Sequence, residues 1–471
     1  MTSSISRRHL LSGTAAAGLG IAITGNVAAV AGTRASEGYG ELVDDPDGLL
    51  SLPAGFSYTL VARTGVTTTT DGAKTASDPD GTGVFALGGG WALVNNHEIG
   101  RTIAQPPGPE AFGVPPLAGL TYDPGNRGGT STIEVDADGN RITEYVSLAG
   151  TSTNCAGGKS PWGTWLTCEE TEDRSGRVRQ KDHGYVFEVD PSSQAANVGK
   201  SPVPLKFLGR FAHEAVSIDP ETTVIYETED ADEPNGLFYR WVPPEGFTPG
   251  KDALRTLALD SGGDTAGRLQ AMSCYRGSTH VPDLSAATTP GTRYTVQWID
   301  VPDRDAATVS LRSQFTDEQV TRGRKLEGTW WGDGGAYIVS SFARTSDGSL
   351  HEHDGQIWLY DPATESVTLQ TIFGVNLDPA VDSDSYDGPD NITVSPYGGV
   401  IIAENGQGIQ HLVGVTDQGK TYPIARNDLN ESEFTGPCFS DDGKILFACI
   451  QSPGHVFAIT GPWRRPSNAD T

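Results

Sequence analysis

The sequence predicts an all-β protein, a six-bladed β-propeller with loop insertions and a short helix. The chain of 471 residues contains 59 Gly and 30 Pro, a composition typical of many short strands joined by turns. Six β-hairpins recur along the chain and carry polar residues at matching positions. Most hairpins are followed by a third strand and some by a fourth, which is the repeat of a propeller blade. A β-sandwich would also contain many short strands, but it does not explain this recurrence.

Each predicted hairpin joins two apolar strands through a turn that contains Gly or Pro. In chain order, the hairpins occupy residues 84–98, 154–170, 211–230, 325–340, 390–405 and 433–448. Third strands are expected at residues 184–189, 236–241, 355–360, 410–415 and 454–459, and fourth strands at residues 142–146, 203–208 and 367–372. A strand at residues 56–62 is expected to close the ring with the C-terminal strands.

Residues 243–324 depart from this repeat, and we expect them to elaborate one blade. Within this region the sequence predicts a loop at residues 249–259, an outer strand at residues 294–298, and a short helix at residues 315–324 capped by Thr316. No low-complexity linker indicates a separate domain. The sequence therefore predicts a single propeller domain over residues 32–471.

Residues 1–31 are typical of a twin-arginine signal peptide. Arg7 and Arg8 precede an apolar, Gly- and Ala-rich run at residues 13–30, and Ala29-Val30-Ala31 forms a small-x-small cleavage site. A membrane anchor fits less well, because the run is only mildly hydrophobic and no other segment reaches spanning length. We therefore expect recognition by the twin-arginine export machinery and cleavage without stable membrane insertion afterwards. The product would be a secreted, cell-envelope or periplasmic monomer.

Charge and cysteine content restrict the partners and the redox state. The net charge is −27 without a basic stripe to offset it, which excludes nucleic acid and anionic lipid as partners and favours cations. The 5 cysteines of an exported chain leave at least one thiol unpaired in a monomer. Cys438 and Cys449 flank the turn at Asp441-Asp442-Gly443, where either a cross-strand disulfide or two free thiols would fit.

Polar residues gather where each first strand begins and each second strand ends. In a propeller both positions face one mouth of the central channel. Carboxylate and amide oxygens are ligands of Ca²⁺, whereas a thiolate favours a transition metal. Close carboxylates repel one another unless they are protonated or bind cations, so the mouth predicts a metal cluster. The residues are Asn96, Glu98, Asn154, Cys155, Glu169, Glu170, His213, Glu214, Glu227, Glu229, Glu327, Asp390, Asn391, Glu404, Asn405 and Glu433.

Lysine and histidine side chains near the mouth have two interpretations each. Lys325 shares a strand face with Glu327 and would hold an anionic substrate against the metals, unless it is a surface lysine paired with an acid. His97 and His213 are either ligands or, more simply, core histidines. The spacing of an EF-hand, a zinc ribbon, HExxH or a P-loop does not occur.

Several of these motifs resemble those of the PhoX-type alkaline phosphatases. The likeness runs from the signal segment to residues 459–463 and includes Asn95-Asn96-His97-Glu98, Cys155-Ala156-Gly157-Gly158, the stretch from Trp162 to Glu170, Phe211-Ala212-His213-Glu214 and Glu404-Asn405. The resemblance implies a propeller mouth with Fe³⁺ and Ca²⁺ ions in an oxo-bridged cluster, with Cys155 and Glu214 on iron. Lys325 would be the catalytic cation, in place of an arginine of the family. The candidate metal ligands are Asn96, Glu98, Cys155, Glu169, Glu214, Glu327, Asp390, Asn391, Glu404 and Asn405.

The sequence thus favours an exported metallophosphatase that hydrolyses phosphomonoesters. Two alternatives stay open. A calcium-dependent propeller hydrolase of another class, such as a lactonase, would need neither a thiolate nor an anion-binding cation. A non-enzymatic extracellular propeller would use calcium for stability and bind a partner.

Overall fold

Antiparallel strands dominate the computed structural model, which describes residues 38–105, 112–260, 262–383 and 385–466. All of these residues belong to one unit, Ser36–Thr471. The predicted signal peptide at residues 1–31 lies outside the described residues. None of the helices in the described ranges has the length and apolar character that crossing a membrane requires.

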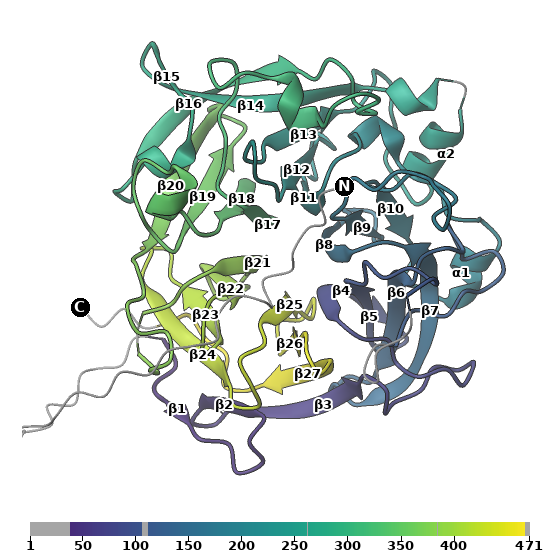
Figure 1. Cartoon of the computed structure of the whole chain (residues 1–471). Helices are drawn as coiled ribbons and strands as arrows, with labels where there is room; N and C mark the ends of the chain where they lie inside the picture. Colours follow the sequence, from purple (N-terminus) through teal and green to yellow (C-terminus); the bar gives the residue numbers. More distant parts are fainter. Residues whose placement is uncertain (1–37, 106–111, 261, 384, 467–471) are drawn as a thin grey trace, which may run out of the picture. The chain divides into compact units, whose positions relative to one another are not determined.

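The strands form five hydrogen-bonded sheets in the described part of the chain, arranged around a common centre (Figure 1). The first sheet contains β4 (Pro79–Leu87), β5 (Gly90–His97), β6 (Gly128–Val135) and β7 (Arg141–Thr151). The second contains β8 (Asn154–Lys159), β9 (Trp165–Glu169) and β10 (Val186–Val189). The C-terminal sheet contains β25 (Phe434–Phe439), β26 (Ile445–Ile450), β27 (His455–Thr460) and β3 (Ser57–Arg63).

The other two sheets are larger. A six-stranded sheet has the order β1 (Leu42–Val43), β2 (Leu50–Pro53), β24 (Thr421–Asn427), β23 (His411–Val415), β22 (Val400–Glu404) and β21 (Pro389–Val394). A ten-stranded sheet contains β11 (His213–Ile218), β12 (Ile225–Glu229), β13 (Phe238–Val242), β14 (Arg268–Arg276), β15 (Thr279–Val281), β16 (Arg293–Asp300), β17 (Leu326–Gly332), β18 (Gly335–Ser340), β19 (Gly355–Asp361) and β20 (Ser366–Phe373).

The first strand of each hairpin lies innermost and contacts the first strand of the next. These contacts run from β4 to β8, β11, β17, β21 and β25 and return to β4, so the inner strands close a ring. At the outer edge β3 pairs with β27, with Ser57 opposite Thr460 and Arg63 opposite His455. The strand predicted at residues 56–62 therefore joins the C-terminal strands as expected. The arrangement confirms the prediction of an all-β, propeller-like fold.

The five sheets do not correspond one to one with six predicted blades. β16 pairs with both β14 and β20, and it thereby joins the units β11–β14 and β17–β20 into the ten-stranded sheet. This strand belongs to the elaboration at residues 243–324 and contains the predicted outer strand at residues 294–298.

The predicted fourth strand at residues 203–208 is wrong. The segment forms a loop and the 3₁₀ helix η2 (Lys206–Leu208), so the second sheet has three strands. Pro202 and Pro204 lack N–H groups, which removes donors that a strand would need. A main-chain bond from Leu205 N to Val186 O, 2.9 Å, ties the segment to β10.

The helical predictions in the elaboration are also wrong. Residues 315–324 form a turn, because the N–H groups of Thr321, Arg322 and Gly323 bond to other segments of the chain. The predicted loop at residues 249–259 contains a helix, α2 (Ala253–Leu259). The remaining helices are α1 (Gln194–Val198) and the 3₁₀ helices η3 (Gly263–Thr265), η4 (Leu284–Ala286), η5 (Leu311–Gln314) and η6 (Thr345–Asp347).

All 5 cysteines are buried free thiols. In the register of β25 and β26, Cys438 lies opposite Phe447 and Cys449 lies opposite Thr435. The two thiols therefore do not face each other across the hairpin, and the disulfide between them is not formed.

Apolar side chains fill the space between neighbouring sheets. Trp165 packs with Phe85 in a cluster shared by the first two sheets, whereas the next residue, Leu166, packs with Val216 and Trp241 on the opposite side. Successive residues of β9 thus pack into two different hydrophobic clusters, one on each face of the sheet. Truncation of such a buried side chain to Ala would cost about 2–5 kcal/mol of unfolding free energy. This packing fixes the inner strands and the residues at their ends.

Candidate metal centre

Each inner hairpin contains a register shift near the start of its first strand. In five of them the first residue of the shifted segment is a carboxylate or a thiol, whereas the sixth has Gly436. A β-bulge turns a side chain out of the alternating pattern of its strand. The five bulge residues are Asp80, Cys155, Glu214, Glu327 and Asp390.

Small residues follow four of these bulge positions, because neighbouring inner strands approach closely there. A Cβ atom added at Gly81 would lie 2.6 Å from the Cα of Ala156. One added at Gly328 would lie 2.8 Å from the carbonyl oxygen of Asp390. The absence of a side chain at these glycines lets the ligand-bearing segments lie against one another.

Two groups of potential ligand atoms result, and they share Glu214. Cys155, Glu170 and Glu214 each offer an atom within 4.8 Å of the others, and Glu214, Glu327 and Asp390 do the same. Cys155, Glu214 and Glu327 are nearly inaccessible, with exposed fractions of 4%, 3% and 4%. The sequence-predicted ligands Cys155, Glu214, Glu327 and Asp390 therefore lie together.

The surroundings of these acidic side chains disfavour their ionised forms. Burial, followed by neighbouring carboxylates, raises the pKa values of Glu170, Glu214 and Glu327 well above their ordinary range. Burial and then Glu214 raise the pKa of the Cys155 thiol in the same way. Multivalent cations would reverse these shifts, because they stabilise the ionised carboxylates and thiolate.

Glu98 and Asp80 extend the centre toward the first and last sheets. Gln451 Nε2 donates to Glu98 Oε2 at 2.7 Å and to Asp80 Oδ2 at 3.4 Å. The other carboxylate oxygen of Asp80, Oδ1, is buried and has no hydrogen-bond partner. Burial, Asp78 and Asp390 raise the pKa of Glu98 to about 7. An unpartnered buried oxygen among close carboxylates fits a cation-binding site.

Lys325 supplies a positive charge at the edge of this centre. Its Nζ lies 2.5 Å from Asp230 Oδ2 and 2.7 Å from Glu327 Oε1. The residue has φ of +47°, a left-handed conformation that costs a non-glycine residue about 1–3 kcal/mol.

The asparagines support the bulges from the side. Asn96 Nδ2 donates to the carbonyl oxygens of Cys155 and Ala156 at 3.0 and 2.7 Å, and its Oδ1 accepts from Trp165. Asn391 Nδ2 and Asn405 Nδ2 donate to the two carboxylate oxygens of Asp390 at 3.0 and 3.1 Å. As placed, Asn96 orients the Cys155 bulge, and the other two orient Asp390.

Glu169 and Glu404 lie outside both ligand groups. Glu169 accepts hydrogen bonds from Ser152 N, Gly184 N and Tyr185 N at 2.9, 2.9 and 3.2 Å, and His183 Nδ1 lies 2.6 Å from its Oε1. Glu404 accepts from Asp387 N at 2.6 Å and from His411 N at 2.8 Å.

Each of these two glutamates is the last residue of a second strand, opposite the residue that precedes a bulge. Glu229 has the same place in β12 and accepts hydrogen bonds from Leu237 N and Tyr239 Oη. This position thus fastens the hairpin to its third strand, and the next residue, such as Glu170 or Asp230, faces the centre.

The two histidines have partners away from the ligand groups. His97 Nδ1 lies 2.9 Å from Ser77 O, and its Nε2 lies 2.9 Å from Ser131 Oγ. His213 Nε2 lies 3.3 Å from Gly209 O, whereas its Nδ1, 3.3 Å from Glu227 Oε2, makes no hydrogen bond within the described residues. Both histidines are buried, and neither belongs to a ligand group.

Asp80, Asp230 and Gln451 are parts of the centre that the sequence prediction did not include. Asp80 had a recognisable signal, because Asp80-Gly81 repeats the order of a potential ligand and a small residue that is found in Cys155-Ala156, Glu214-Ala215 and Glu327-Gly328. Gln451 had none, since it lies beyond the end of β26 and carries no charge.

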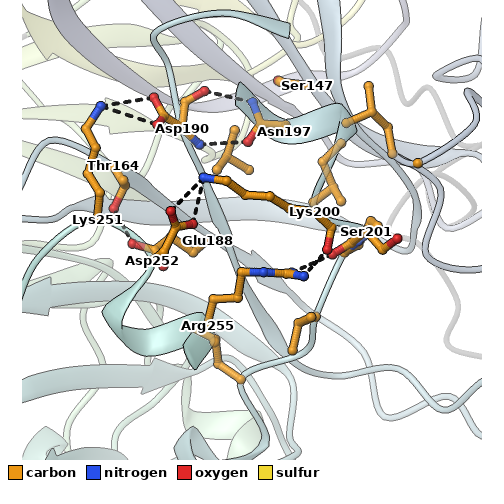
Figure 2. Close-up of a pocket in the computed structure, with 17 residues that line it drawn as sticks. Ser147, Thr164, Glu188, Asp190, Asn197, Lys200, Ser201, Lys251, Asp252 and Arg255 are labelled. Atoms are coloured by element: carbon orange, nitrogen blue, oxygen red, sulfur yellow. Dashed lines mark hydrogen bonds and ion pairs between the residues drawn. The ribbon is translucent and has the colours of Figure 1, made fainter. Parts of the chain in front are cut away.

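A separate cavity lies at the outer side of the second sheet (Figure 2). It has an empty volume of about 530 Å³ and occupies the side where the predicted fourth strand is missing. Its cations are already paired, with Lys200 2.7 Å from Asp252 and Lys251 3.1 Å from Asp190 (Figure 2). None of the candidate ligands lines it.

The family model for the alkaline phosphatase PhoX matches residues 37–143 and 137–454 of this chain. Among solved structures, Pseudomonas fluorescens PhoX in complex with vanadate, a transition state analogue, matches with 18% identity and a TM-score of 0.64. The match covers 90% of this chain and 98% of that chain, and it supports the propeller-like fold.

Two other solved structures align at lower similarity. A gluconolactonase from Xanthomonas campestris has 10% identity and a TM-score of 0.43, over 90% of this chain and 98% of its own. The PQQ domain of pyranose dehydrogenase from Coprinopsis cinerea has 12% identity and a TM-score of 0.36, over 87% and 97%. No curated protein sequence matches significantly.

Proposed function

This chain belongs to the alkaline phosphatase PhoX family, and from that premise we propose that it hydrolyses phosphomonoesters at the two ligand groups that share Glu214. Family membership makes the protein a metal-dependent phosphatase. The observation that supports the site is the convergence of ligand-type side chains from β8, β11, β17 and β21, each placed by a bulge near the start of its strand.

We propose Fe³⁺ and Ca²⁺ as the cations. Cys155 and Glu214, with Glu170 beside them, would hold iron, because a thiolate suits a transition metal. The remaining oxygens suit Ca²⁺, which accepts several oxygen ligands in flexible geometry. We propose Glu98, Glu327 and Asp390 as ligands, with Asp80 added for its unpartnered oxygen. Glu169, Glu404 and Asn96 are better explained as residues that position the ligands, since their polar atoms already bond to protein groups.

When bound, the cations would polarise the phosphoryl oxygens of the substrate and activate water. The chain itself contributes Lys325, whose ammonium group would bind a phosphoryl oxygen and offset its negative charge. Glu327 and Asp230 hold this group in place at 2.7 and 2.5 Å. Lysine acts as a point charge and not as a bidentate fork, so it fixes the charge and leaves the orientation of the phosphoryl group to the metals.

We further propose that the ten-stranded sheet comprises two blades joined by β16, which gives six blades in all. We propose export of a monomer through the twin-arginine machinery to the cell envelope or the medium, from the pattern around Arg7 and Arg8. Replacement of both arginines by lysine should keep the precursor inside the cell. Accumulation of the processed protein outside would contradict this route.

The central experiment is elemental analysis of the exported protein together with a p-nitrophenyl phosphate assay. We expect iron and calcium in the protein and phosphate release that a chelator abolishes. A protein with calcium, without iron and without turnover would instead match the non-enzymatic propeller. Calcium without iron, with hydrolysis of a lactone but not of a phosphate ester, would match the other class of hydrolase.

A further inference from the structure

A cavity with two arginines lies beside the metal centre. It has an empty volume of about 440 Å³, including the part open to solvent, and its lining includes Asp78, Glu98, Arg101 and Arg127. Two arginines among the lining residues of one cavity are notable in a chain of net charge −27. The two arginines offset the charges of Asp78 and Glu98, so an anionic group would meet less repulsion in this cavity than at the acidic centre beside it.

Glu98 connects the cavity to the metal centre. It lines the cavity, and Gln451 Nε2, which bonds its Oε2 at 2.7 Å, also bonds Asp80 of the inner strand β4. A small molecule with one end at the metal centre would thus extend past Glu98 into this cavity.

Arg127 is well placed to contact such a molecule. Its main chain is tied to the neighbouring segment, because its carbonyl oxygen accepts from Val114 N at 2.8 Å. Gly113 leaves room for the aliphatic part of the side chain, since a Cβ atom added there would lie 2.9 Å from Arg127 Cβ. Within the described ranges, the guanidinium group makes one hydrogen bond, from Nε to Thr102 O at 3.3 Å. The terminal N–H groups can therefore serve a ligand in the fork geometry that suits a carboxylate.

We propose that this cavity is the leaving-group subsite of the phosphatase and that it favours phosphomonoesters whose alcohol carries a second negative charge, above all a carboxylate. The inference rests on the proposed function. In the reaction, the ester P–O bond breaks, water provides the oxygen of the new P–O bond, and the departing hydroxy acid takes up a proton. Arg127 binds the carboxylate of that hydroxy acid, and Arg101 adds positive charge to the cavity.

A pair of substrates that differ in one group tests the subsite. In 3-phosphoglycerate the departing alcohol carries a carboxylate, whereas glycerol 3-phosphate has a hydroxymethyl group in the same place. We expect kcat/KM to be higher for 3-phosphoglycerate. The ratio of the two values should fall about tenfold in Arg127→Gln, mainly through KM, as expected for the loss of one charge-assisted hydrogen bond.

The control variant is Arg268→Gln, which removes an exposed arginine of β14 that pairs with Asp300. It should leave the ratio unchanged. A second measurement uses the unaltered enzyme, in which the ratio should decrease as salt screens the arginines.

Three outcomes are separable. A ratio near one, or a ratio that neither Arg127→Gln nor salt alters, overturns the subsite while glycerol 3-phosphate hydrolysis still supports the phosphatase. If neither ester is hydrolysed by the metal-loaded protein, the proposed function fails and the subsite fails with it. A ratio above one that falls in Arg127→Gln and with salt, but not in Arg268→Gln, supports the subsite.

Discussion

Cys155 and Glu214 present a thiol and a carboxylate within 4.8 Å of each other from the bulges of adjacent inner strands. Burial and Glu214 raise the pKa of this thiol, so the thiolate that a metal needs is unfavourable without the metal. Metal binding should therefore deprotonate the Cys155 thiol. This centre differs from a calcium site because a soft ligand, the Cys155 thiol, lies beside a hard one, the Glu214 carboxylate.

Replacement of Cys155 by Ala should abolish iron binding and phosphatase activity, because the remaining oxygen ligands hold calcium better than they select iron. Elemental analysis and p-nitrophenyl phosphate turnover measure both effects. The matched control is Cys274→Ala, a buried free thiol on β14 that belongs to neither ligand group. It should keep iron and activity, and full turnover by Cys155→Ala would remove the thiolate from the mechanism.

The neighbouring residues Glu169 and Glu170 should have opposite mutant phenotypes. Glu169→Gln weakens several main-chain and histidine hydrogen bonds, and we expect the unfolding free energy to drop by about 2–4 kcal/mol. Glu170→Gln removes a carboxylate that other carboxylates repel, so the metal-free protein should be at least as stable as the original. Thermal melts of chelated protein measure stability.

Metal content completes this comparison. Glu170→Gln should lose iron and activity, whereas Glu169→Gln should keep some of both at a temperature where it stays folded. If Glu169→Gln loses metal without losing stability, Glu169 is a metal ligand, and its assignment as a residue that links the hairpin to the third strand is incorrect.

This pair of glutamates also shows which features of the site can be predicted from the sequence and which cannot. The hairpins and the ring order follow from strand alternation and turn residues, and they place both glutamates at the end of a second strand. Which of the two faces the centre depends on the bulge at Cys155 and Ala156, opposite Cys168, which no local pattern in β9 encodes. The partners that fasten Glu169 come from His183 to Tyr185, beyond a long loop. Which individual side chains face the centre therefore depends on contacts between segments that lie far apart in the sequence.

Lys325→Met should reduce kcat/KM for p-nitrophenyl phosphate by roughly 10²–10³-fold, the usual effect of removing one preorganised donor from an anionic transition state. Lys325→Arg keeps the positive charge and should recover a large part of the activity. Inhibition by vanadate should weaken in parallel with kcat/KM, because both report binding of the phosphoryl-like group.

The control for Lys325 is Lys444→Met, an exposed lysine that pairs with Asp442 at the end of the C-terminal hairpin. Its kinetics should match those of the original protein. An unchanged kcat/KM in Lys325→Met, with metals bound, would assign Lys325 only to the neutralisation of Asp230 and Glu327.

The stability of the metal-free protein should fall as the pH rises. Burial, Asp78 and Asp390 raise the pKa of Glu98 from an ordinary value of 4.5 to about 7. The folded state therefore binds this proton more tightly than the unfolded state, so the stabilisation is present below pH 4.5 and is lost as the pH passes 7. The loss from Glu98 alone would be roughly 3 kcal/mol of unfolding free energy.

Urea unfolding of chelated protein between pH 5 and pH 8 measures this effect, and the decline over the same range should be smaller in Glu98→Gln. The comparison with this variant is necessary because other groups add losses of the same sign. Burial raises the pKa values of Glu229 and Asp387 to about 7. Although burial opposes the charge of His411, hydrogen bonds to Asp382 and Glu404 raise its pKa to about 9. Bound metals should remove the Glu98 contribution, since they favour the ionised carboxylate. A metal-free protein that is as stable at pH 8 as at pH 5, with the same profile in Glu98→Gln, would mean that the carboxylates of this centre do not repel one another as their positions require.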